Sequence, residues 1–337
     1  MFCLSGVPVL VTGGAGFIGS HLAESLDADG AAVTVLDNLR DGSADNLRTA
    51  PGVRLVAADV RSAEVVGRVI RVHRPRVVFH LAANASVPGS VDDPAYDFAA
   101  NSVGTFVVLD ALRRLGGCER VVLASSGAVY GQPDEFPIRE SAPRRPISPY
   151  GASKVSAEVT ARMFWDVYRL PVITARLFNS FGPRMARFVI LDFLRKLARN
   201  PDELEILGDG RQVRDFTYVT DTVQGLRLLA DRGESGEAYN LSSGTSCSVT
   251  ELAHQLLGVL GLAGRTRLRY TGASWNGDAQ RWEVCIEKLA ALGYRPAVSL
   301  REGLLRTAAW FRMREPRWDP AMHLAVPGGS HTCPAQG

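Results

Sequence analysis

The sequence predicts an α/β protein built on a doubly wound parallel sheet. Three observations point to this fold class: short apolar runs alternate with longer amphipathic segments through the first half of the chain, a glycine-rich turn follows the first run, and an acidic residue ends the second. Strands that alternate with helices form parallel sheets whose two faces are covered by those helices. We therefore expect a Rossmann-type sheet joined to a smaller, mixed C-terminal domain.

The apolar runs give the order of the expected elements, because each is short and bounded by polar or turn-forming residues. The predicted strands are residues 7–12, 32–37, 53–57, 77–81, 121–125, 172–176 and 237–241. Amphipathic helices are predicted at 187–199, 249–260 and 300–312, and residues 206–221 are predicted as a loop that leads into a strand and a helix.

Length and composition are those of an ordinary globular protein. The 337 residues are 46% hydrophobic and 22% charged, and the formal net charge is only +3. No basic run of the kind that follows a phosphate backbone is present, so a nucleic-acid partner is not expected. No segment approaches the roughly 18 uninterrupted apolar residues of a membrane span, so no membrane is expected either.

The cysteines and the first residues bear on localisation. The five cysteines are odd in number, scattered and never spaced as C-x-x-C, which is typical of free thiols in a reducing compartment. The first residues lack a basic stretch and run into the glycine-rich turn, which favours a buried strand over a signal peptide. We expect a cytoplasmic protein. Because no His, Cys or carboxylate cluster has metal-ligand spacing, no metal is expected.

The glycine-rich turn has the composition of a phosphate cradle. Gly13, Gly16 and Gly19 form G-x-x-G-x-x-G between the first predicted strand and a predicted helix, with Phe17 and Ile18 inside the motif. Glycines allow the backbone to approach a pyrophosphate closely, and the helix N-terminus offers unpaired N–H groups and a positive dipole end. The turn therefore predicts a dinucleotide site.

Acidic residues after the next two strands extend this site. Asp37, with Asn38 beside it, ends the second strand, where a carboxylate binds the adenosine ribose and repels a 2′-phosphate. This position favours NAD over NADP, although Arg40 lies close enough to accommodate the extra phosphate. Asp59, followed by Val60, comes after the third strand. It is expected near the adenine, with a plain helix cap as the alternative.

The fourth strand ends in small residues suited to contact with a dinucleotide, and we assign Leu81, Ala82 and Ala83 to the cofactor site. A second chemical pattern follows at "SPYGASKVSAE", where Tyr150 precedes Lys154 by one helical turn, so that both project from one face. A cation beside a phenol favours the phenolate and makes it a usable base. Chance pairing on a helix surface is the plain alternative.

Taken together, these motifs resemble the extended short-chain dehydrogenases/reductases, specifically their nucleotide-sugar epimerases and dehydratases. The matching pieces run from about residue 7 to 311 and are "TGGAGFIGS", "LDNL", "ADVRS", "HLAA", "NSVGT", "SSGAVYG", "SPYGASK", "RLFNSFGPR", "GDGRQVRDFTYVTD", "YNLSSG" and "LGYRPAVSLREGL". The resemblance implies that Tyr150 is the catalytic base, that Lys154 orients the nicotinamide ribose and lowers the tyrosine pKa, and that Ser126 bonds the reacting sugar hydroxyl. Asn101, in "NSVGT", joins the implied cofactor contacts.

The resemblance leaves the reaction open, and the residues after Ser126 help to choose it. Dehydratases of this family typically carry an Asp-Glu pair there, and decarboxylases commonly have a glutamate before V-Y-G, but this chain has Gly127 and Ala128. Neither side chain can move a proton. We therefore expect a 4-epimerase: Tyr150 takes the O4 proton as C4 gives hydride to NAD, the 4-keto sugar turns, and hydride and proton return to the other face.

The resemblance also implies the substrate contacts. Asn179 would contact the substrate diphosphate, Arg214 would pair with a phosphate, and Arg184 could reach the sugar or a uronic acid carboxylate, with a structural ion pair as its alternative. Many relatives place an Arg-Pro-Gly-Asp arginine at the position of Trp275. Arg281 is expected to supply a cation in its place. The expected substrate is a UDP-hexose or UDP-hexuronic acid, with the base itself open.

The expected organisation follows from these assignments. Residues 1–178 form the NAD-binding domain, to which 212–243 return, residues 179–320 form a discontinuous substrate-binding region, and 321–337 form a flexible tail. A homodimer is implied by the resemblance alone. Three alternatives remain in view: a reductase or dehydrogenase that releases its cofactor, a decarboxylase, and a non-catalytic protein that senses a dinucleotide.

Overall fold

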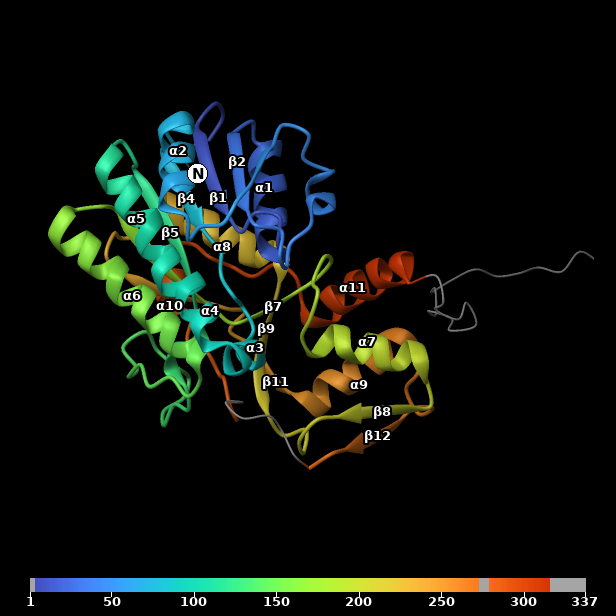
Figure 1. The fold of residues 1–337 in the computed structure, drawn as a ribbon. Helices are drawn as coiled ribbons and strands as arrows, with labels where there is room; N and C mark the ends of the chain where they lie inside the picture. The colour runs from blue at the N-terminus through green and yellow to red at the C-terminus, as the bar shows by residue number, and fades with distance from the viewer. Residues whose placement is uncertain (1–3, 273–278, 316–337) are drawn as a thin grey trace, which may run out of the picture.

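The computed structural model describes residues 4–272 and 279–315 and confirms the predicted α/β architecture (Figure 1). Seven parallel strands form the larger sheet, in the order β10-β6-β5-β4-β1-β2-β3. They are β1 (Pro8–Thr12), β2 (Ala32–Asp37), β3 (Arg54–Ala57), β4 (Val77–His80), β5 (Arg120–Ser126), β6 (Val172–Leu177) and β10 (Ala238–Leu241). The ends of these strands lie within one residue of those predicted from the apolar runs.

Helices cover both faces of this sheet because its strands are apolar on both sides. Along β1, Val9 and Val11 face one hydrophobic core, whereas Leu10 faces another. The first core contains side chains of α1 (Phe17–Ala28), α8 (Val219–Arg232) and α10 (Glu287–Ala291). The second contains side chains of α2 (Ala63–His73), α5 (Gly104–Leu115) and α6 (Pro149–Tyr168).

The start of α6 is defined by local sequence. Ser148 is its N-cap and accepts a hydrogen bond from the Gly151 N–H at 3.1 Å, while Pro149 occupies the first helical position. Proline fits there because its missing N–H would have no helical partner, and its fixed φ suits a helix. The following residues, including Tyr150 and Lys154, therefore lie in the first turns of a helix that packs beside β5.

The smaller part of the chain is built from short strands and three helices. Its mixed three-stranded sheet, ordered β11-β9-β7, and its two-stranded sheet of β12 and β8 lie beside a separate hydrophobic core. The elements are β7 (Asn179–Phe181), α7 (Val189–Arg199), β8 (Glu203–Ile206), β9 (Val213–Tyr218), β11 (Ser246–Ser248), α9 (Val249–Leu260), β12 (Arg267–Tyr270) and α11 (Leu300–Arg314). Figure 1 shows this part beside one end of the larger sheet.

Short helical turns complete the described structure. They are Ala44–Leu47 and Gly127–Tyr130 in 3-10 conformation, α3 (Val87–Asp92), α4 (Pro94–Phe98) and the π-helical turn Ala99–Val103. The chain passes from the larger to the smaller sheet between Leu177 and Asn179. The domain boundaries stay a prediction, and the tail at 321–337 lies outside the described residues. Within those residues, no helix has the length and apolar content needed to cross a membrane.

Candidate active site

A cavity of about 360 Å³ lies between the two parts of the molecule, at the carboxyl ends of strands β1, β2, β4, β5 and β6. Ligands of open α/β sheets bind at this edge. Most of the predicted site residues line the cavity: Gly13, Gly16, Phe17, Ile18, Gly19, Asp37, Asn38, Asp59, Val60, Leu81, Ala82, Ala83, Ser126, Tyr150, Lys154, Asn179, Arg184 and Arg214. Asn101 and Arg281 are not among the lining residues.

The glycine turn is tight enough to require glycine at two positions. Gly13 has φ +70°, and a Cβ there would lie 2.6 Å from the backbone nitrogen of Ala82. A Cβ at Gly19 would lie 2.2 Å from the carbonyl oxygen of Gly13. Gly16, the N-cap of α1, has no side chain to cap the helix, so the first N–H groups are left for a ligand. This cradle fits the diphosphate of a dinucleotide.

The carboxylate of Asp37 is held in place at the edge of the cavity. One oxygen accepts a hydrogen bond from the Ala15 N–H at 2.9 Å, and the other accepts from the Leu39 N–H at 2.8 Å. The side chain is buried, and the residue lines the cavity. A carboxylate in this position suits ribose hydroxyls and disfavours a 2′-phosphate.

Asp59 is also fixed at this end, and the helix-cap alternative for it is wrong. Its carboxylate accepts hydrogen bonds from Arg61 and, at 2.9 Å, from the Asn38 side-chain amide. The bond from Arg61 is the main reason that the pKa of Asp59 falls to about 2. Helix α2 is capped by Ser62, whose hydroxyl accepts from the Val65 N–H.

The predictions missed an aromatic side chain that closes this end of the cavity. Tyr96, on α4, lies beneath the Arg40 guanidinium, which is 3.7 Å from the ring centroid. Both residues line the cavity. Arg40, which kept NADP open in the sequence, is thus engaged with an aromatic ring in this structure. A tyrosine followed by an acidic helical turn gives no signal by which the sequence could have shown this contact.

Tyr150 lies on the first turn of α6 with its side chain almost entirely buried. Burial raises the pKa of the phenol above its ordinary value, while a hydrogen bond with Ser126 and the charge of Arg187 lower it. The negative charge of Asp97 raises it further. Burial prevails in this structure, and Lys154 is not among the groups that lower the pKa of Tyr150. A lowering of that pKa by Lys154 stays a prediction.

Lys154 is a buried cation one turn after Tyr150. Its ammonium donates a 2.9 Å hydrogen bond to the carbonyl oxygen of Ala124 and lies 6.0 Å from the centroid of the Tyr150 ring. Burial lowers the pKa of Lys154 to about 8, against the charges of Asp97 and Glu158, which raise it. The two carboxylates therefore favour the charged ammonium and oppose the effect of burial.

Asn101 belongs to a buried network behind the cavity and not to its wall. Its amide nitrogen donates to Asp97 Oδ1 at 3.1 Å and to Ser153 Oγ at 2.9 Å, while its Oδ1 accepts from the Asn84 N–H at 2.8 Å. Ser153 Oγ also donates to Asp97 Oδ2 at 2.6 Å. Asn101 thus fixes Asp97 beside the first turn of α6, and its assignment to the cofactor stays a prediction.

The two residues after Ser126, Gly127 and Ala128, begin a tight turn and carry no proton-transfer group. Ser126 is the cap of the turn Gly127–Tyr130, and its Oγ accepts from the Ala128 N–H at 3.2 Å. A Cβ at Gly127 would lie 2.4 Å from Cε1 of Phe178, which packs over the turn. Ser126, Ala128 and Phe178 all line the cavity.

The predicted substrate residues lie on the opposite wall. Asn179 donates to the carbonyl oxygen of Asp215 at 3.3 Å, which fixes its amide beside the cavity. Arg214 is buried, donates to the carbonyl oxygen of Val213 at 2.8 Å, and lies over the Trp282 ring at 5.1 Å. Both residues are therefore placed by the small sheet, and their contacts with a phosphate stay a prediction.

The structure pairs Arg184 and Arg281, two arginines predicted to contact the substrate, with carboxylates, and it adds Arg187 to the cavity. Arg184 forms an ion pair with Glu24 at 2.6 Å, as the alternative for it predicted. Arg281 pairs with Glu283 and lies over Phe136, outside the cavity wall. Arg187 was missed in the sequence, yet it lines the cavity and its charge acts on Tyr150. Trp275 lies outside the described residues.

A protein-family model described as GDP-mannose 4,6 dehydratase matches residues 10–304, nearly the whole described structure. The chain belongs to this family. The resemblance to extended short-chain dehydrogenases/reductases is thereby confirmed, and so is the fold class. Relatives in the GDP-mannose 4,6 dehydratase family include both epimerases and dehydratases of nucleotide sugars, so the chain is an enzyme of this group.

Three relatives of the family illustrate this range. A UDP-glucose 4-epimerase from Mycolicibacterium smegmatis is 36% identical over 90% of this chain and 98% of its own length. The structure of a UDP-glucose 4-epimerase from Thermotoga maritima, with UDP-glucose, has a TM-score of 0.85 and 35% identity and covers 91% of this chain and 99% of its own. A dTDP-glucose 4,6-dehydratase from Streptomyces venezuelae, with NAD bound, has a TM-score of 0.84 and 33% identity and covers 93% and 99%.

These relatives support the prediction of NAD as cofactor, and they leave open whether the chain epimerises or dehydrates its substrate. Over residues 4–272 and 279–315, no three His, Cys, Asp or Glu side chains gather as a possible ion site.

Proposed function

We propose that the protein is an NAD-dependent nucleotide-sugar 4-epimerase that acts on a UDP-hexose or UDP-hexuronic acid. NAD would be held by the glycine cradle, Asp37 and Lys154, and when bound it supplies a reversible hydride acceptor. The pyrophosphate would meet the N–H groups at the start of α1. The relatives support a nucleotide sugar as substrate, since one of them is solved with UDP-glucose.

In this proposal, the residues of the chain itself handle one proton. Tyr150 takes the proton of the sugar O4 and later returns it, and the Ser126 hydroxyl, already oriented by its bond from the Ala128 N–H, holds the same oxygen. Lys154 keeps a positive charge beside the phenol. No other acid or base is needed, because the same group accepts and donates the proton.

The observation that carries the choice of epimerisation is the turn at Gly127 and Ala128. Loss of water from the sugar needs an additional acid and base, and Gly127 and Ala128, the two residues directly after Ser126, supply neither. Ala128 lies on the cavity wall. Phe178 occupies the space that a side chain at residue 127 would need. The turn is therefore packed as an apolar surface against which an uncharged keto sugar can turn.

Arg187 bears on the choice between a hexose and a hexuronic acid. It lines the cavity near the catalytic phenol, and its nearest carboxylate is Asp41, 3.6 Å away at the exposed rim. Arginine binds carboxylates well because its guanidinium donates parallel hydrogen bonds. Within the proposed function, Arg187 would bind the carboxylate of a hexuronic acid. It therefore supports a UDP-hexuronic acid as a candidate substrate beside a UDP-hexose.

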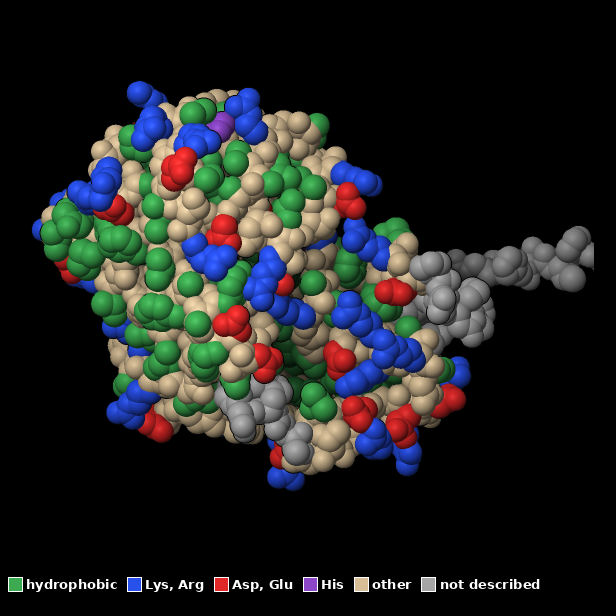
Figure 2. All heavy atoms as spheres, viewed as in Figure 1, with side chains coloured by type: hydrophobic (Ala, Val, Ile, Leu, Met, Phe, Trp, Pro, Cys, Tyr) green, Lys and Arg blue, Asp and Glu red, His purple; other side chains and the backbone are tan. Residues whose placement is uncertain are grey.

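We further propose a homodimer formed through helices α5 and α6. The outer apolar stripe consists of Phe106 on α5, Val159, Met163 and Val167 on α6, and Phe98 and Val103 in the turns just before α5, all of which are at least 37% exposed. Figure 2 shows hydrophobic side chains gathered at the side of the molecule where Figure 1 places α5 and α6. Large exposed apolar surfaces of this kind mark protein interfaces.

The function is tested by proton NMR in deuterated water. The purified protein, without added cofactor, is incubated with UDP-glucose, UDP-galactose, UDP-glucuronic acid and the corresponding dTDP-sugars. We expect a C4 stereoisomer that carries no deuterium at carbon, and the Tyr150→Phe variant should lower its rate by about 10²–10⁴-fold.

The other reactions of the family give different products in the same tubes. A 4-keto-6-deoxy sugar would identify a dehydratase, and loss of carbon dioxide a decarboxylase. Turnover only after NADH is added would identify a reductase. Any of these outcomes would replace the epimerase assignment, and binding of NAD without turnover of any sugar would favour the sensor.

A further inference from the structure

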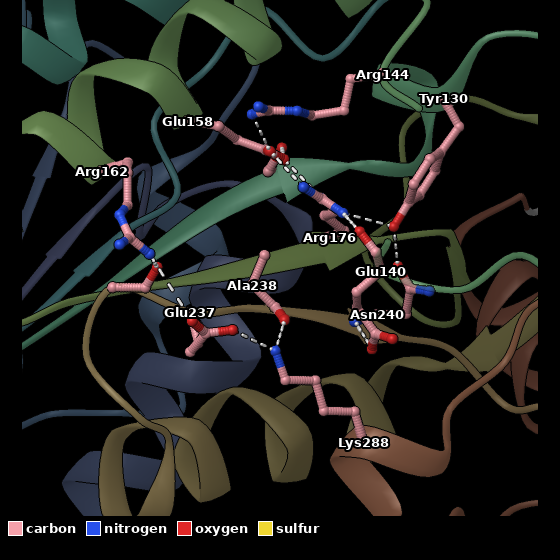
Figure 3. A network of polar contacts seen from close by, with 12 residues as sticks. Tyr130, Glu140, Arg144, Glu158, Arg162, Arg176, Glu237, Ala238, Asn240 and Lys288 are labelled. Carbon is pink, nitrogen blue, oxygen red and sulfur yellow. Dashed lines mark hydrogen bonds and ion pairs between the residues drawn. The ribbon is translucent and has the colours of Figure 1, made fainter. Parts of the chain in front are cut away.

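Glu158 lies one turn after Lys154 on α6 and is the centre of a buried polar network (Figure 3). Arg176, on β6, donates to its two carboxylate oxygens at 2.9 and 2.8 Å. Ser125 Oγ donates to the same carboxylate at 2.5 Å, and Arg144 donates at 3.3 Å. Glu158 is only 4% exposed. The network thus holds a fully desolvated carboxylate against a cavity residue, since Ser125 lines the cavity.

Lys154 and Glu158 fasten the same helix face to successive residues of β5. The Lys154 ammonium donates to the carbonyl oxygen of Ala124, and the Glu158 carboxylate accepts from the hydroxyl of Ser125. The next residue of the strand is Ser126, which forms a hydrogen bond with Tyr150. Two contacts one helical turn apart therefore set the position of the catalytic helix on the strand that carries Ser126.

The titratable groups around Lys154 come from three elements. Asp97 on α4 and Glu158 on α6 are the carboxylates that act on the ammonium. His80 on β4 is buried, with its ring nitrogens bonded to Thr12 and Thr105, and burial lowers its pKa to about 3, so it stays neutral. Asp97 and Glu158 are thus the carboxylates that favour the ammonium, and Glu158 does so while the guanidinium groups of Arg176 and Arg144 bind it.

We propose that Glu158, held by Arg176, is a positioning residue of the active site that seats α6 on β5 and supplies a negative charge to the Lys154 ammonium. This inference rests on the proposed function for its meaning in catalysis, but the charge effect is a property of the protein alone. A merely structural ion pair would tie α6 to β6 without acting on Lys154.

The sequence offers a direct measurement, because the chain contains only three lysines, Lys154, Lys196 and Lys288. Protein labelled with ¹³C-lysine gives three Cε resonances, which Lys196→Arg and Lys288→Arg variants assign. We expect Lys154 to titrate below the ordinary range of a lysine, because burial lowers its pKa. In Glu158→Gln, which keeps the shape of the side chain, its midpoint should move to still lower pH because a carboxylate that favours the ammonium has been removed.

Two matched variants distinguish the effect of the Glu158 charge on Lys154 from a general loss of stability. Arg176→Lys keeps the carboxylate, and Tyr130→Phe removes a hydroxyl that accepts from Arg176 Nη1 at 2.7 Å on the far side of the network. Both should weaken thermal stability and leave the Lys154 midpoint unchanged. An unchanged midpoint in Glu158→Gln, or an equal shift in Tyr130→Phe, would overturn the proposal. If Glu158→Gln does not fold, the double variant Glu158→Gln/Arg176→Met is compared with Arg176→Met, from which it differs only by the carboxylate, and its Lys154 midpoint should lie at lower pH.

The pH dependence of enzyme activity provides a second, independent test of the proposal. In Glu158→Gln the alkaline limb of the kcat profile should move to lower pH, with a loss of about 10–100-fold above the new midpoint and a smaller loss below it. A uniform loss at every pH would leave Glu158 only a structural role in catalysis and contradict the proposal. If the wild-type protein epimerises no sugar, the proposed function fails, while the lysine titration still decides the charge effect.

Discussion

Phe178 lies directly over Gly127, so closely that a Cβ at residue 127 would be 2.4 Å from its Cε1 and 2.6 Å from its Cδ1. Phe178 is itself wedged between Tyr130, with which it stacks at 6.3 Å, and Trp282, whose ring it meets edge-on at 5.7 Å. The ring therefore has little room to withdraw. The absence of a side chain at Gly127 is enforced by the packing of the cavity wall.

Gly127→Ala should consequently destabilise the protein by about 1–3 kcal/mol, because the added methyl overpacks a buried contact. Urea unfolding of this variant and the wild type gives the difference. Gly258→Ala is the matched control, since a Cβ at that position, in the interior of α9, meets no atom within 4 Å. It should be neutral or stabilise by up to about 1 kcal/mol. Equal effects of the two substitutions would contradict this account of the Phe178 contact.

Arg187→Leu should move the acidic limb of the kcat/KM profile to higher pH. The guanidinium lowers the pKa of Tyr150, so its removal raises that pKa and leaves less phenolate at a given pH. The loss of activity should therefore be larger at pH 6 than at pH 9. Arg187→Lys keeps the charge and should keep the limb in place; the idea fails if the lysine variant shifts as far as the leucine variant.

Asp97→Asn should shift both limbs of the same profile to lower pH. The carboxylate raises the pKa of Tyr150 and that of Lys154, so removing its charge lowers both. Glu158, by contrast, acts on Lys154 and is not among the groups that act on Tyr150, so its removal should move the alkaline limb alone. Ser153→Ala is the control for Asp97, because it removes a hydrogen bond to this carboxylate and leaves the charge. If only one limb of the profile moves in Asp97→Asn, then Asp97 does not act on both Tyr150 and Lys154.

Substitution in the outer apolar stripe should produce a monomer. Phe106 and Val159 are 47% and 53% exposed, and a glutamate at both positions would place charges within the proposed interface. Light scattering coupled to size exclusion gives the mass of the wild type and of the double variant. Val72→Glu is the control, since Val72 is 66% exposed on α2, outside the stripe. A wild type that elutes as a monomer would exclude the proposed interface.

The larger sheet was predictable because its strands are buried on both faces, and such burial leaves continuous apolar runs in the sequence. The small strands were not predictable. β7 and β11 have three residues each, "NSF" and "SCS", and β8 and β12 have four each, "ELEI" and "RLRY". They are too short for a period to show, and they are strands because a neighbouring segment supplies hydrogen bonds.

The site divides in the same way. The glycine cradle and the Tyr150–Lys154 pair depend on neighbours within one turn or one helical repeat, so the sequence reveals them. Asp97 and Arg187 reach Tyr150 from distant parts of the chain, and Arg184 turns to Glu24 on α1. Only the tertiary fold determines those contacts. Glu158 was missed although its spacing, four residues after Lys154, puts it on the same helix face.

Helix α6 contributes side chains to the active site, to the outer apolar stripe and to the hydrophobic core. Tyr150, Lys154 and Glu158 occupy its inner face, whereas Val159, Met163 and Val167 face outward in the stripe. Ala157, Ala161 and Phe164 fill the core between it and the sheet. Few positions of α6 can therefore be substituted without loss of stability or activity. A library of single substitutions in α6 should contain fewer active members than a library of α2, whose outer face is mostly solvated.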